Sequence, residues 1–151
     1  TGLLEFKNET FDLSTCFGVL TYIMNPEVVL NEFIRVLKPG GTLLIREPST
    51  DMHVGQGIER WGMGEESRGL PPDFYEGEFV KLNVSYNITH CMFSPWIEFG
   101  KKVMKAPMNH RWFIKVDSLF CKLFKWNWKY QRQTFCDKFA PGSLFVTVKK
   151  F

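Results

Sequence analysis

The chain has 151 residues, of which 44% are hydrophobic and 23% charged, and its formal net charge is +3. This length fits one domain, and the composition is that of a globular protein and excludes a fibrous or disordered one. No apolar run approaches the length of about 18 residues that a membrane span needs, and the N-terminus lacks the pattern of a signal peptide.

The four cysteines are widely spaced and include no CxxC pair; they are Cys16, Cys91, Cys121 and Cys136. This spacing predicts reduced thiols of a cytoplasmic protein and not a disulfide framework. The cysteines, His90 and His110 also lack the spacing of zinc ligands, so we predict no metal site.

The first third of the chain predicts a strand, a helix and a second strand joined by short links. The apolar segment TFDLSTCFGVL (10–20) is typical of a strand. Asn25-Pro26 begins a helix that extends to Leu37, because proline is favoured in the first turn and apolar residues then recur at helical spacing. Pro39-Gly40-Gly41 ends this helix, and 42–48 follows as a buried strand. Such a connection indicates a right-handed parallel crossover in an α/β sheet.

Residues 49–70 are polar and contain five glycines, at positions 55, 57, 62, 64 and 69. They show no sustained periodicity, so we expect a mobile loop at the rim of an active site.

The remaining chain predicts two helices and two strands within one domain, 1–151. Pro71-Pro72 precedes a helix over 73–81, and strands are expected over 83–93 and 144–149. In 112–125 apolar residues recur at spacings of three and four with lysines on the other side, which predicts an amphipathic helix. We interpret 94–141 as an accessory insertion between the last two strands.

The segment FDLSTCFGVLTYIMNPEVVLNEFIRVLKPGGTLLIREP (11–48) resembles the second half of class I S-adenosylmethionine-dependent methyltransferases. In that family a strand opened by Phe-Asp precedes a helix ending in Arg-Val-Leu-Lys-Pro-Gly-Gly, and the next parallel strand follows. RGLPPDFYE (68–76) and the segment 116–150 are similar to a subgroup of polysaccharide and glycoconjugate pathways. The resemblance implies a partial Rossmann-like sheet with flanking helices. Its four strands would lie in the order first, second, fourth, third, with the last strand antiparallel.

The glycine-rich loop by which this family binds its cofactor is absent from the sequence. In the family that loop follows the first strand, and an acidic residue after the second strand holds the ribose. The sequence starts at Thr1, about ten residues before the family's fourth strand. We therefore expect a truncated domain without the N-terminal cofactor-binding strands, whose binding of S-adenosyl-L-methionine and activity require a front half supplied from elsewhere.

Ligands of open parallel sheets lie beyond the carboxyl ends of the strands. The resemblance implies that Cys16 and Phe17 line the methionine end of the cofactor, with Tyr22 nearby. The alternative is that Cys16 and Phe17 are only core residues.

Charged residues close the second strand, where packing alone does not call for them. Arg46 is a candidate for binding the acceptor and Glu47 for a general base; alternatively they pair with each other or with a charge on the loop. On that loop, His53 is a candidate acid or base and Asp51 a candidate acceptor-binding residue, unless both are simply solvated.

Two further residues are candidates for holding an acceptor. Arg68 could fold over an anionic acceptor such as a sugar phosphate, or could be a surface arginine. Trp96 could stack on the face of a sugar, or could belong to an aromatic core.

Between Lys101 and Arg132 nine lysines or arginines face a single acid, Asp117. Three interpretations remain open: a helix with a solvated basic face, a surface that contacts a membrane carrying a lipid-linked glycan, and, least supported, a nucleic-acid surface.

Two functions follow from these observations. The first is transfer of a methyl group to a small-molecule or glycan acceptor by a methyltransferase of which this chain is the C-terminal portion. The alternative is a non-catalytic half-domain that forms homo-oligomers or binds a partner. Without preceding strands, the edge of Phe11–Phe17 would be exposed, and an apolar edge strand is a template for self-association.

Overall fold

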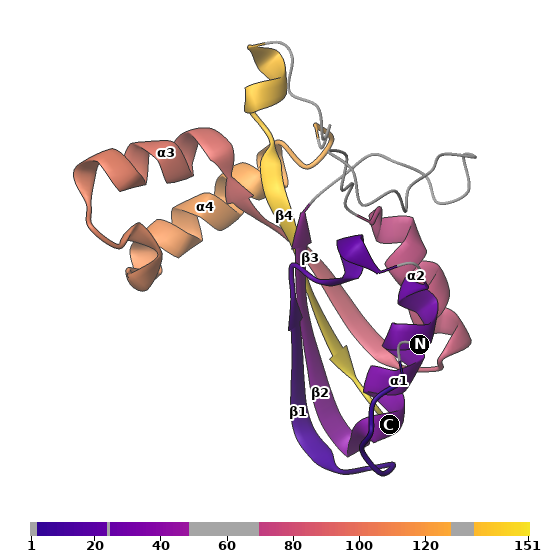
Figure 1. The fold of residues 1–151 in the computed structure, drawn as a ribbon. Helices are drawn as coiled ribbons and strands as arrows, with labels where there is room; N and C mark the ends of the chain where they lie inside the picture. Colours follow the sequence, from indigo (N-terminus) through magenta and orange to yellow (C-terminus); the bar gives the residue numbers. More distant parts are fainter. Residues whose placement is uncertain (1–2, 24, 49–69, 128–134) are drawn as a thin grey trace.

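The computed structural model describes residues 3–23, 25–48, 70–127 and 135–151 (Figure 1). Its sheet contains β1 (Phe11–Phe17), β2 (Leu37–Pro48), β3 (Ser85–Phe93) and β4 (Pro141–Lys149) in the order β1-β2-β4-β3. β1 and β2 are parallel, whereas β4 runs antiparallel to both β2 and β3. The predicted α/β class, strand order and antiparallel last strand are therefore confirmed.

Two helices cover one face of this sheet. Figure 1 shows α1 (Pro26–Val36) and α2 (Pro72–Lys81) on the same side of the four strands. Because alternate residues of a strand point to opposite faces, alternate side chains in the middle of β2 and β4 are buried in a core shared with these helices. The shared core includes Leu30 and Ile34 of α1, Tyr75 and Phe79 of α2, and from the sheet Cys16, Leu43, Ile45, Leu144, Val146 and Val148.

The turn between α1 and β2 is shorter than the sequence predicts. The helix ends at Val36, and Leu37 already pairs with Phe11 of β1. The next register pair is Leu13 with Thr42, so the intervening residues of β2 form an irregularity inside the strand and not a separate turn. Gly40 has a φ of +78°, and its amide donates to the Lys150 carbonyl at 2.9 Å. Glycine adopts this conformation at little cost.

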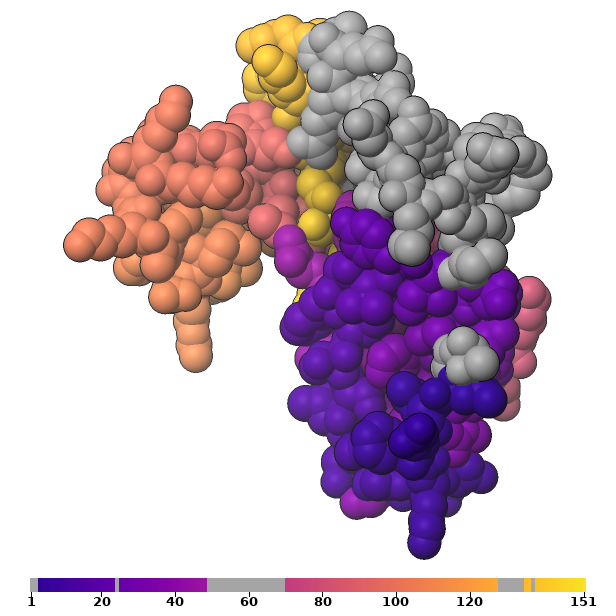
Figure 2. All heavy atoms as spheres, in the orientation of Figure 1, coloured from indigo at the N-terminus to yellow at the C-terminus, as the bar shows by residue number. Residues whose placement is uncertain are grey.

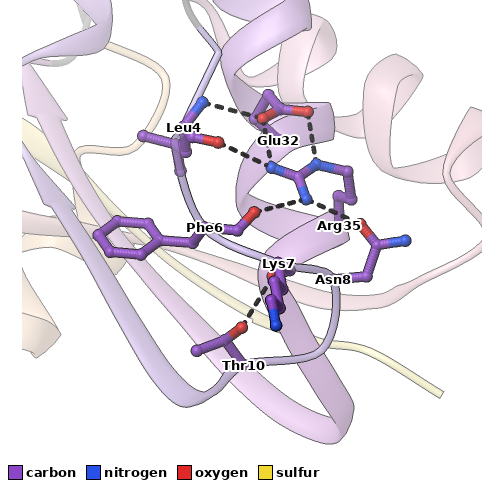
Figure 3. A network of polar contacts seen from close by, with 7 residues as sticks. All are labelled: Leu4, Phe6, Lys7, Asn8, Thr10, Glu32 and Arg35. Atoms are coloured by element: carbon purple, nitrogen blue, oxygen red, sulfur yellow. Dashed lines mark hydrogen bonds and ion pairs between the residues drawn. The ribbon is translucent and has the colours of Figure 1, made fainter.

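A guanidinium ties the segment before β1 to helix α1 (Figure 3). Arg35 forms a two-pronged ion pair with Glu32, at 2.8 Å for both nitrogen–oxygen distances. The same guanidinium donates to the carbonyls of Leu4 and Phe6, and the Leu4 amide donates to Glu32 at 3.0 Å. This arrangement lowers the pKa of Glu32 to about 2, chiefly because the Arg35 hydrogen bonds favour the charged carboxylate.

A helical hairpin lies on the other side of the sheet, near the carboxyl ends of β1 and β2 (Figure 1). It consists of α3 (Ser94–Val103), a short 3₁₀ turn (Pro107–Asn109) and α4 (Arg111–Leu123). The hairpin occupies much of the predicted insertion, but α3 itself was not predicted. The two helices approach closely at Gly100, where an added Cβ would lie 2.3 Å from the Phe113 ring.

Several predicted boundaries were too generous. The first strand ends at Phe17, and a 3₁₀ turn (Leu20–Tyr22) follows where the apolar run suggested continued strand. The basic amphipathic helix ends at Leu123 rather than at residue 125. By contrast, β4 starts three residues before the predicted 144. The predicted mobile loop 49–70 falls, apart from Leu70, outside the described residues.

Candidate functional site

The carboxyl ends of β1 and β2 lie side by side. Phe17 is the register partner of Arg46, and Cys16 is the partner of Ile45. The predicted parallel pairing of these two strands is therefore confirmed. It brings the end of β1 and the loop that follows it next to the charged end of β2, which is the edge where open parallel sheets bind their ligands.

Glu47 is buried beneath the loop after β1. Its side chain is only 1% exposed. One carboxylate oxygen, Oε1, accepts hydrogen bonds from the amides of Val19 at 2.9 Å and Leu20 at 3.1 Å. Burial raises the pKa of Glu47, while the backbone amides partly oppose this shift. Glu47 thus joins the end of β2 to the chain that leaves β1.

Two buried oxygen atoms at this position have no hydrogen-bond partner among the described residues. They are Oε2 of Glu47 and Oγ1 of Thr21. Buried polar atoms are normally paired, because an unpaired one costs on the order of 1 to 3 kcal/mol. Two buried acceptor atoms, one from Glu47 and one from Thr21, therefore stay unpaired among the described residues at the carboxyl ends of β1 and β2.

Arg46 points to the opposite face of the sheet from Glu47. Neighbouring residues of a strand alternate between faces, and the Arg46 guanidinium lies 2.8 Å from the sulfur of Met92. The proposed ion pair between Arg46 and Glu47 is therefore wrong. The suggested roles in binding an acceptor and in proton transfer stay predictions.

The three candidate cofactor residues differ in exposure. Cys16 is 3% exposed and belongs to the core beneath α1. Burial raises the pKa of its thiol to about 12, and the nearby Glu47 adds to this shift. Phe17 and Tyr22 instead expose 50% and 70% of their surface, so two aromatic side chains flank the end of β1 in contact with solvent.

The other candidate residues lie away from this edge or outside the described chain. Asp51, His53 and Arg68 fall outside the described residues. Trp96 is part of the packing between α3 and α4, where its indole nitrogen donates to the Phe113 carbonyl at 3.1 Å and its ring stacks on Phe113 at 4.7 Å. Its proposed stacking on a sugar stays a prediction.

Asp117 has a role that the sequence reasoning missed. This residue is 2% exposed and accepts hydrogen bonds from the amides of Met92 at 2.9 Å and Phe93 at 2.7 Å. It therefore fastens α4 to the carboxyl end of β3. The available signal was its position: Asp117 is four residues from Phe113 and from Cys121, on the apolar face of an otherwise basic helix.

A groove of about 500 Å³ runs between the edge strand β3 and helix α4. Both elements contribute polar side chains to it, and lysines of and just after α4 form one wall. Its lining residues are Asn87, Ile88, Thr89, His90, Ser118, Cys121, Lys122 and Lys125. The pKa of His90 is lowered, first by burial and then by the neighbouring charge of Lys125, so the imidazole is neutral near pH 7.

Within the described ranges, no group of three His, Cys, Asp or Glu side chains could hold a metal ion. In the same part of the chain, none of the helices has the length and apolar character required to cross a bilayer. The four cysteines are free thiols.

Comparisons with known proteins agree with this geometry. Residues 2–45 match the family model described as "Methyltransferase domain". Over 44 residues the chain is 46% identical to a ubiquinone/menaquinone biosynthesis C-methyltransferase of Ruegeria sp. (strain TM1040). The matched segment makes up 29% of this chain and 18% of that protein.

Two solved structures illustrate the similarity of the fold. An S-adenosylmethionine-dependent methyltransferase from Thermotoga maritima superimposes with a TM-score of 0.56 and 13% identity, over 99% of this chain and 61% of its own. Phosphoethanolamine N-methyltransferase 2 from Haemonchus contortus was solved with phosphomonomethylethanolamine and S-adenosylhomocysteine. It superimposes with a TM-score of 0.56 and a sequence identity of 15%, and the match covers 97% of this chain and 35% of that protein chain. At these identities the similarity shows the fold alone. The match also spans only part of each relative's length.

Proposed function

We propose that the chain corresponds to the C-terminal part of a class I S-adenosylmethionine-dependent methyltransferase domain and takes part in methyl transfer to a small-molecule or glycan acceptor. The cofactor is S-adenosyl-L-methionine, and the pocket for it is completed by a glycine-rich strand-to-helix turn that the 151 residues do not contain. The free thiols favour a reducing compartment, so we place the protein in the cytoplasm.

The observation that carries this proposal is the ligand edge formed by β1 and β2. The segment 2–45, which matches the methyltransferase family, contains β1, α1 and most of β2. The register between Phe17 and Arg46 places the ends of the two strands together, as a ligand bound at the edge of the sheet requires.

The residues at this edge fit one wall of a cofactor pocket. Phe17 and Tyr22 present apolar rings to solvent at the end of β1. Thr21 and Glu47 each keep a buried oxygen atom without a partner among the described residues, and such atoms could accept a hydrogen bond from a bound group. Cys16 lies beneath this wall and would support it through packing.

We assign Glu47 a positioning role in this pocket. The hydrogen bonds that it accepts from the amides of Val19 and Leu20 fix the loop between the two exposed rings, Phe17 and Tyr22. Its raised pKa is also compatible with the general-base role that its place at the end of a buried strand suggests. In that role the unpaired Oε2 would be the oxygen atom that accepts the proton, because Oε1 is occupied by the two backbone amides.

Acceptor recognition is assigned to Arg46 and to residues that follow β2 in the sequence. Arg46 is exposed at the end of its strand. Asp51, His53 and Arg68 follow within the next residues of the sequence, where a carboxylate, an imidazole and a guanidinium can orient an acceptor and move its proton. Trp96 would serve only an acceptor long enough to reach α3.

The test begins with the genomic reading frame around the Thr1 codon. The polypeptide that this reading frame encodes and the 151-residue chain are purified separately. Calorimetry then measures the binding of S-adenosylhomocysteine to each of them. We expect binding by a polypeptide that contains a glycine-rich turn, and none by the 151 residues alone. A complete polypeptide that contains such a turn and yet neither binds S-adenosylhomocysteine nor transfers methyl groups would overturn the proposal.

The second candidate function is a non-catalytic module that associates through β1. This strand lies at the edge of the sheet, and Leu13 and Phe17 expose 55% and 50% of their surface there. A reading frame without a glycine-rich turn, together with a stable homo-oligomer, would favour this alternative.

A further inference from the structure

The hairpin of α3 and α4 exposes a row of large apolar side chains. On α4, the exposed fractions are 52% for Trp112, 55% for Leu119 and 58% for Leu123. With the half-buried Val116, these residues follow the spacing i, i+4, i+7, i+11, so they form one continuous stripe along the helix. A stripe of this length normally faces a protein core, but here the core side of α4 is occupied by Phe113, Asp117 and Cys121.

Helix α3 extends the apolar surface. Phe99 is 52% and Val103 64% exposed, one helical turn apart. The Trp96 ring packs against the rings of Phe99 and Trp112, with distances between ring centroids of 5.4 Å and 6.2 Å. It therefore links the exposed residues of the two helices. We call this surface, formed by Phe99, Val103, Trp112, Val116, Leu119 and Leu123, the hairpin stripe. Figure 2 shows the hairpin as a lobe that projects from the body of the protein.

Many basic side chains accompany the hairpin stripe. The described residues of the hairpin and its C-terminal extension contain seven basic side chains, namely Lys101, Lys102, Lys105, Arg111, Lys115, Lys122 and Lys125. Two acids accompany them. Glu98 pairs with Lys101 at 2.7 Å, and Asp117 is buried against the backbone of β3. The exposed surface of this lobe therefore combines apolar side chains with an excess of positive charge, and on α4 the helical spacing places Arg111, Lys115 and Lys122 along one border of the stripe.

The groove between α4 and β3 adds to this positive border. Ser118, Lys122 and Lys125 follow the spacing i, i+4, i+7 and line the groove together with Asn87 and Thr89 of β3. None of the described residues that line the groove is acidic. Lys122 stands between the groove and the hairpin stripe, so one cation borders both surfaces. Ammonium and hydroxyl groups in this arrangement suit a phosphate oxygen.

From this geometry we propose that the hairpin stripe docks on the surface of a membrane that contains anionic phospholipids. Apolar side chains enter the boundary between headgroups and acyl chains, tryptophan is well suited to that boundary, and lysines contact the phosphates. Each lysine near an anionic surface contributes about 1 kcal/mol, which is roughly a fivefold change in binding. This surface goes beyond the proposed methyl transfer and does not depend on it.

A second copy of the chain fits this surface less well. In a symmetric dimer the same patch lies on both sides of the interface. The lysines that border the stripe would then face lysines, and the lobe has no unpaired exposed acid among its described residues to balance them. Like charges brought together in this way oppose association, whereas an anionic lipid surface supplies the complementary charge.

Vesicle co-sedimentation of the full 151-residue chain tests the proposal. Vesicles of phosphatidylcholine alone are compared with vesicles in which about one third of the lipid is phosphatidylglycerol. We expect the chain to bind the anionic vesicles at least about tenfold more tightly, with a blue shift of tryptophan emission, and to dissociate as salt is raised. Equal binding to both vesicle types, or binding to neither, would overturn the proposal.

Two pairs of variants identify the surface. L119S/L123S removes apolar stripe residues, and V80S, at an exposed position of α2, is its matched control. K115Q/K122Q removes cations beside the stripe, and K7Q/K149Q removes two exposed lysines elsewhere. We expect each hairpin variant to bind anionic vesicles at least about tenfold more weakly, and each control to bind like the parent.

All four substituted positions are exposed, so we expect the hairpin variants to unfold thermally like the parent. Circular dichroism checks that they do. Unchanged vesicle binding by folded L119S/L123S contradicts the proposal. Sedimentation velocity gives the remaining outcome. If L119S/L123S abolishes a concentration-dependent dimer and leaves vesicle binding unaltered, the stripe serves a second copy and not a lipid surface.

Discussion

The carboxylate of Glu47 accepts a hydrogen bond from the Val19 amide at 2.9 Å, and this contact ties the end of β2 to the loop after β1. The Leu20 amide donates to the same oxygen at 3.1 Å. A charged residue that closes a buried strand would normally point to water. Here Glu47 is buried, so its hydrogen bonds and its pKa depend on the loop that covers it.

Substitutions of Glu47 should separate its hydrogen bonds from its charge. In E47A the Val19 and Leu20 amides lose their acceptor, and we expect the free energy of unfolding to fall by about 2 to 3 kcal/mol. In E47Q an amide oxygen can replace Oε1 while no charge is buried, so stability near pH 7 should equal or exceed that of the parent. Urea unfolding checks both values.

The pH dependence of these variants gives an independent readout. Because the pKa of Glu47 is raised in the folded protein, the folded state holds this proton more tightly than the unfolded state. The stabilisation is complete below the ordinary carboxyl pKa and is lost as pH rises through the folded value. E47Q should therefore abolish this decline above about pH 4.5. A decline identical to that of the parent would show that other groups cause it.

Asp117 should be as important for the hairpin as Glu47 is for the loop. D117A removes the acceptor of two backbone amides, those of Met92 and Phe93, and we expect a loss of about 2 to 4 kcal/mol in unfolding free energy. D117N retains one acceptor oxygen and should lose less. An exposed substitution on the same helix, K115Q, serves as the control. Equal stability of D117A and K115Q would contradict the role assigned to Asp117.

Thiol labelling should distinguish the four cysteines. Burial raises the pKa of Cys16 and Cys121 to about 12 and that of Cys91 to about 11, whereas Cys136 is exposed. The thiolate is the reactive form. At pH 7.5, Ellman's reagent should therefore modify Cys136 rapidly and the other three only after unfolding. C136S should remove the fast phase, and a fast phase that persists in C136S would show that one of the other three thiols reacts in the folded protein.

The sequence predicted the frame of the sheet because local signals agree there with tertiary structure. Apolar periodicity, proline at the first turn of α1 and the glycines after Pro39 all indicate the same crossover. The likeness to a known family supplied the strand order. The turn before β2 was misjudged, since the extension of β2 depends on pairing between Gly41 and Lys150, which are distant in sequence.

The site and the hairpin were less predictable because long-range contacts determine them. Whether Glu47 pairs with Arg46 or accepts backbone amides depends on the path of the loop after β1, which no local pattern shows. In helix α3, Pro95 lies in the first turn, where proline is favoured, but Gly100 lies in the interior, where glycine read alone is an unfavourable signal. In the fold, Gly100 instead allows the close approach of Phe113.

Arg35 should determine whether the N-terminal segment stays on helix α1. R35M removes the donors to Glu32, Leu4 and Phe6, so we expect faster hydrogen exchange of the Leu4 amide and earlier proteolysis within residues 3–10. Glu32 should then lose its depressed pKa of about 2. The stabilisation from this carboxylate is present above its ordinary pKa and lost as pH falls toward 2. Acid unfolding should consequently begin at a higher pH in R35M. R111M, at an exposed position with the same change of charge, is the control.

The edge strand β1 provides the last prediction, which concerns self-association. Leu13 is 55% exposed on a strand that has a partner on one side only. A lysine at such a position opposes pairing between edges, because each copy would bring a charge to the interface. If the chain associates through β1, L13K should shift sedimentation velocity profiles toward the monomer at every protein concentration. V80K, at an exposed position of α2, should leave the profiles unchanged. A parent chain that stays monomeric at high concentration would exclude β1 as an association edge, and a dimer that persists in L13K would place the contact elsewhere.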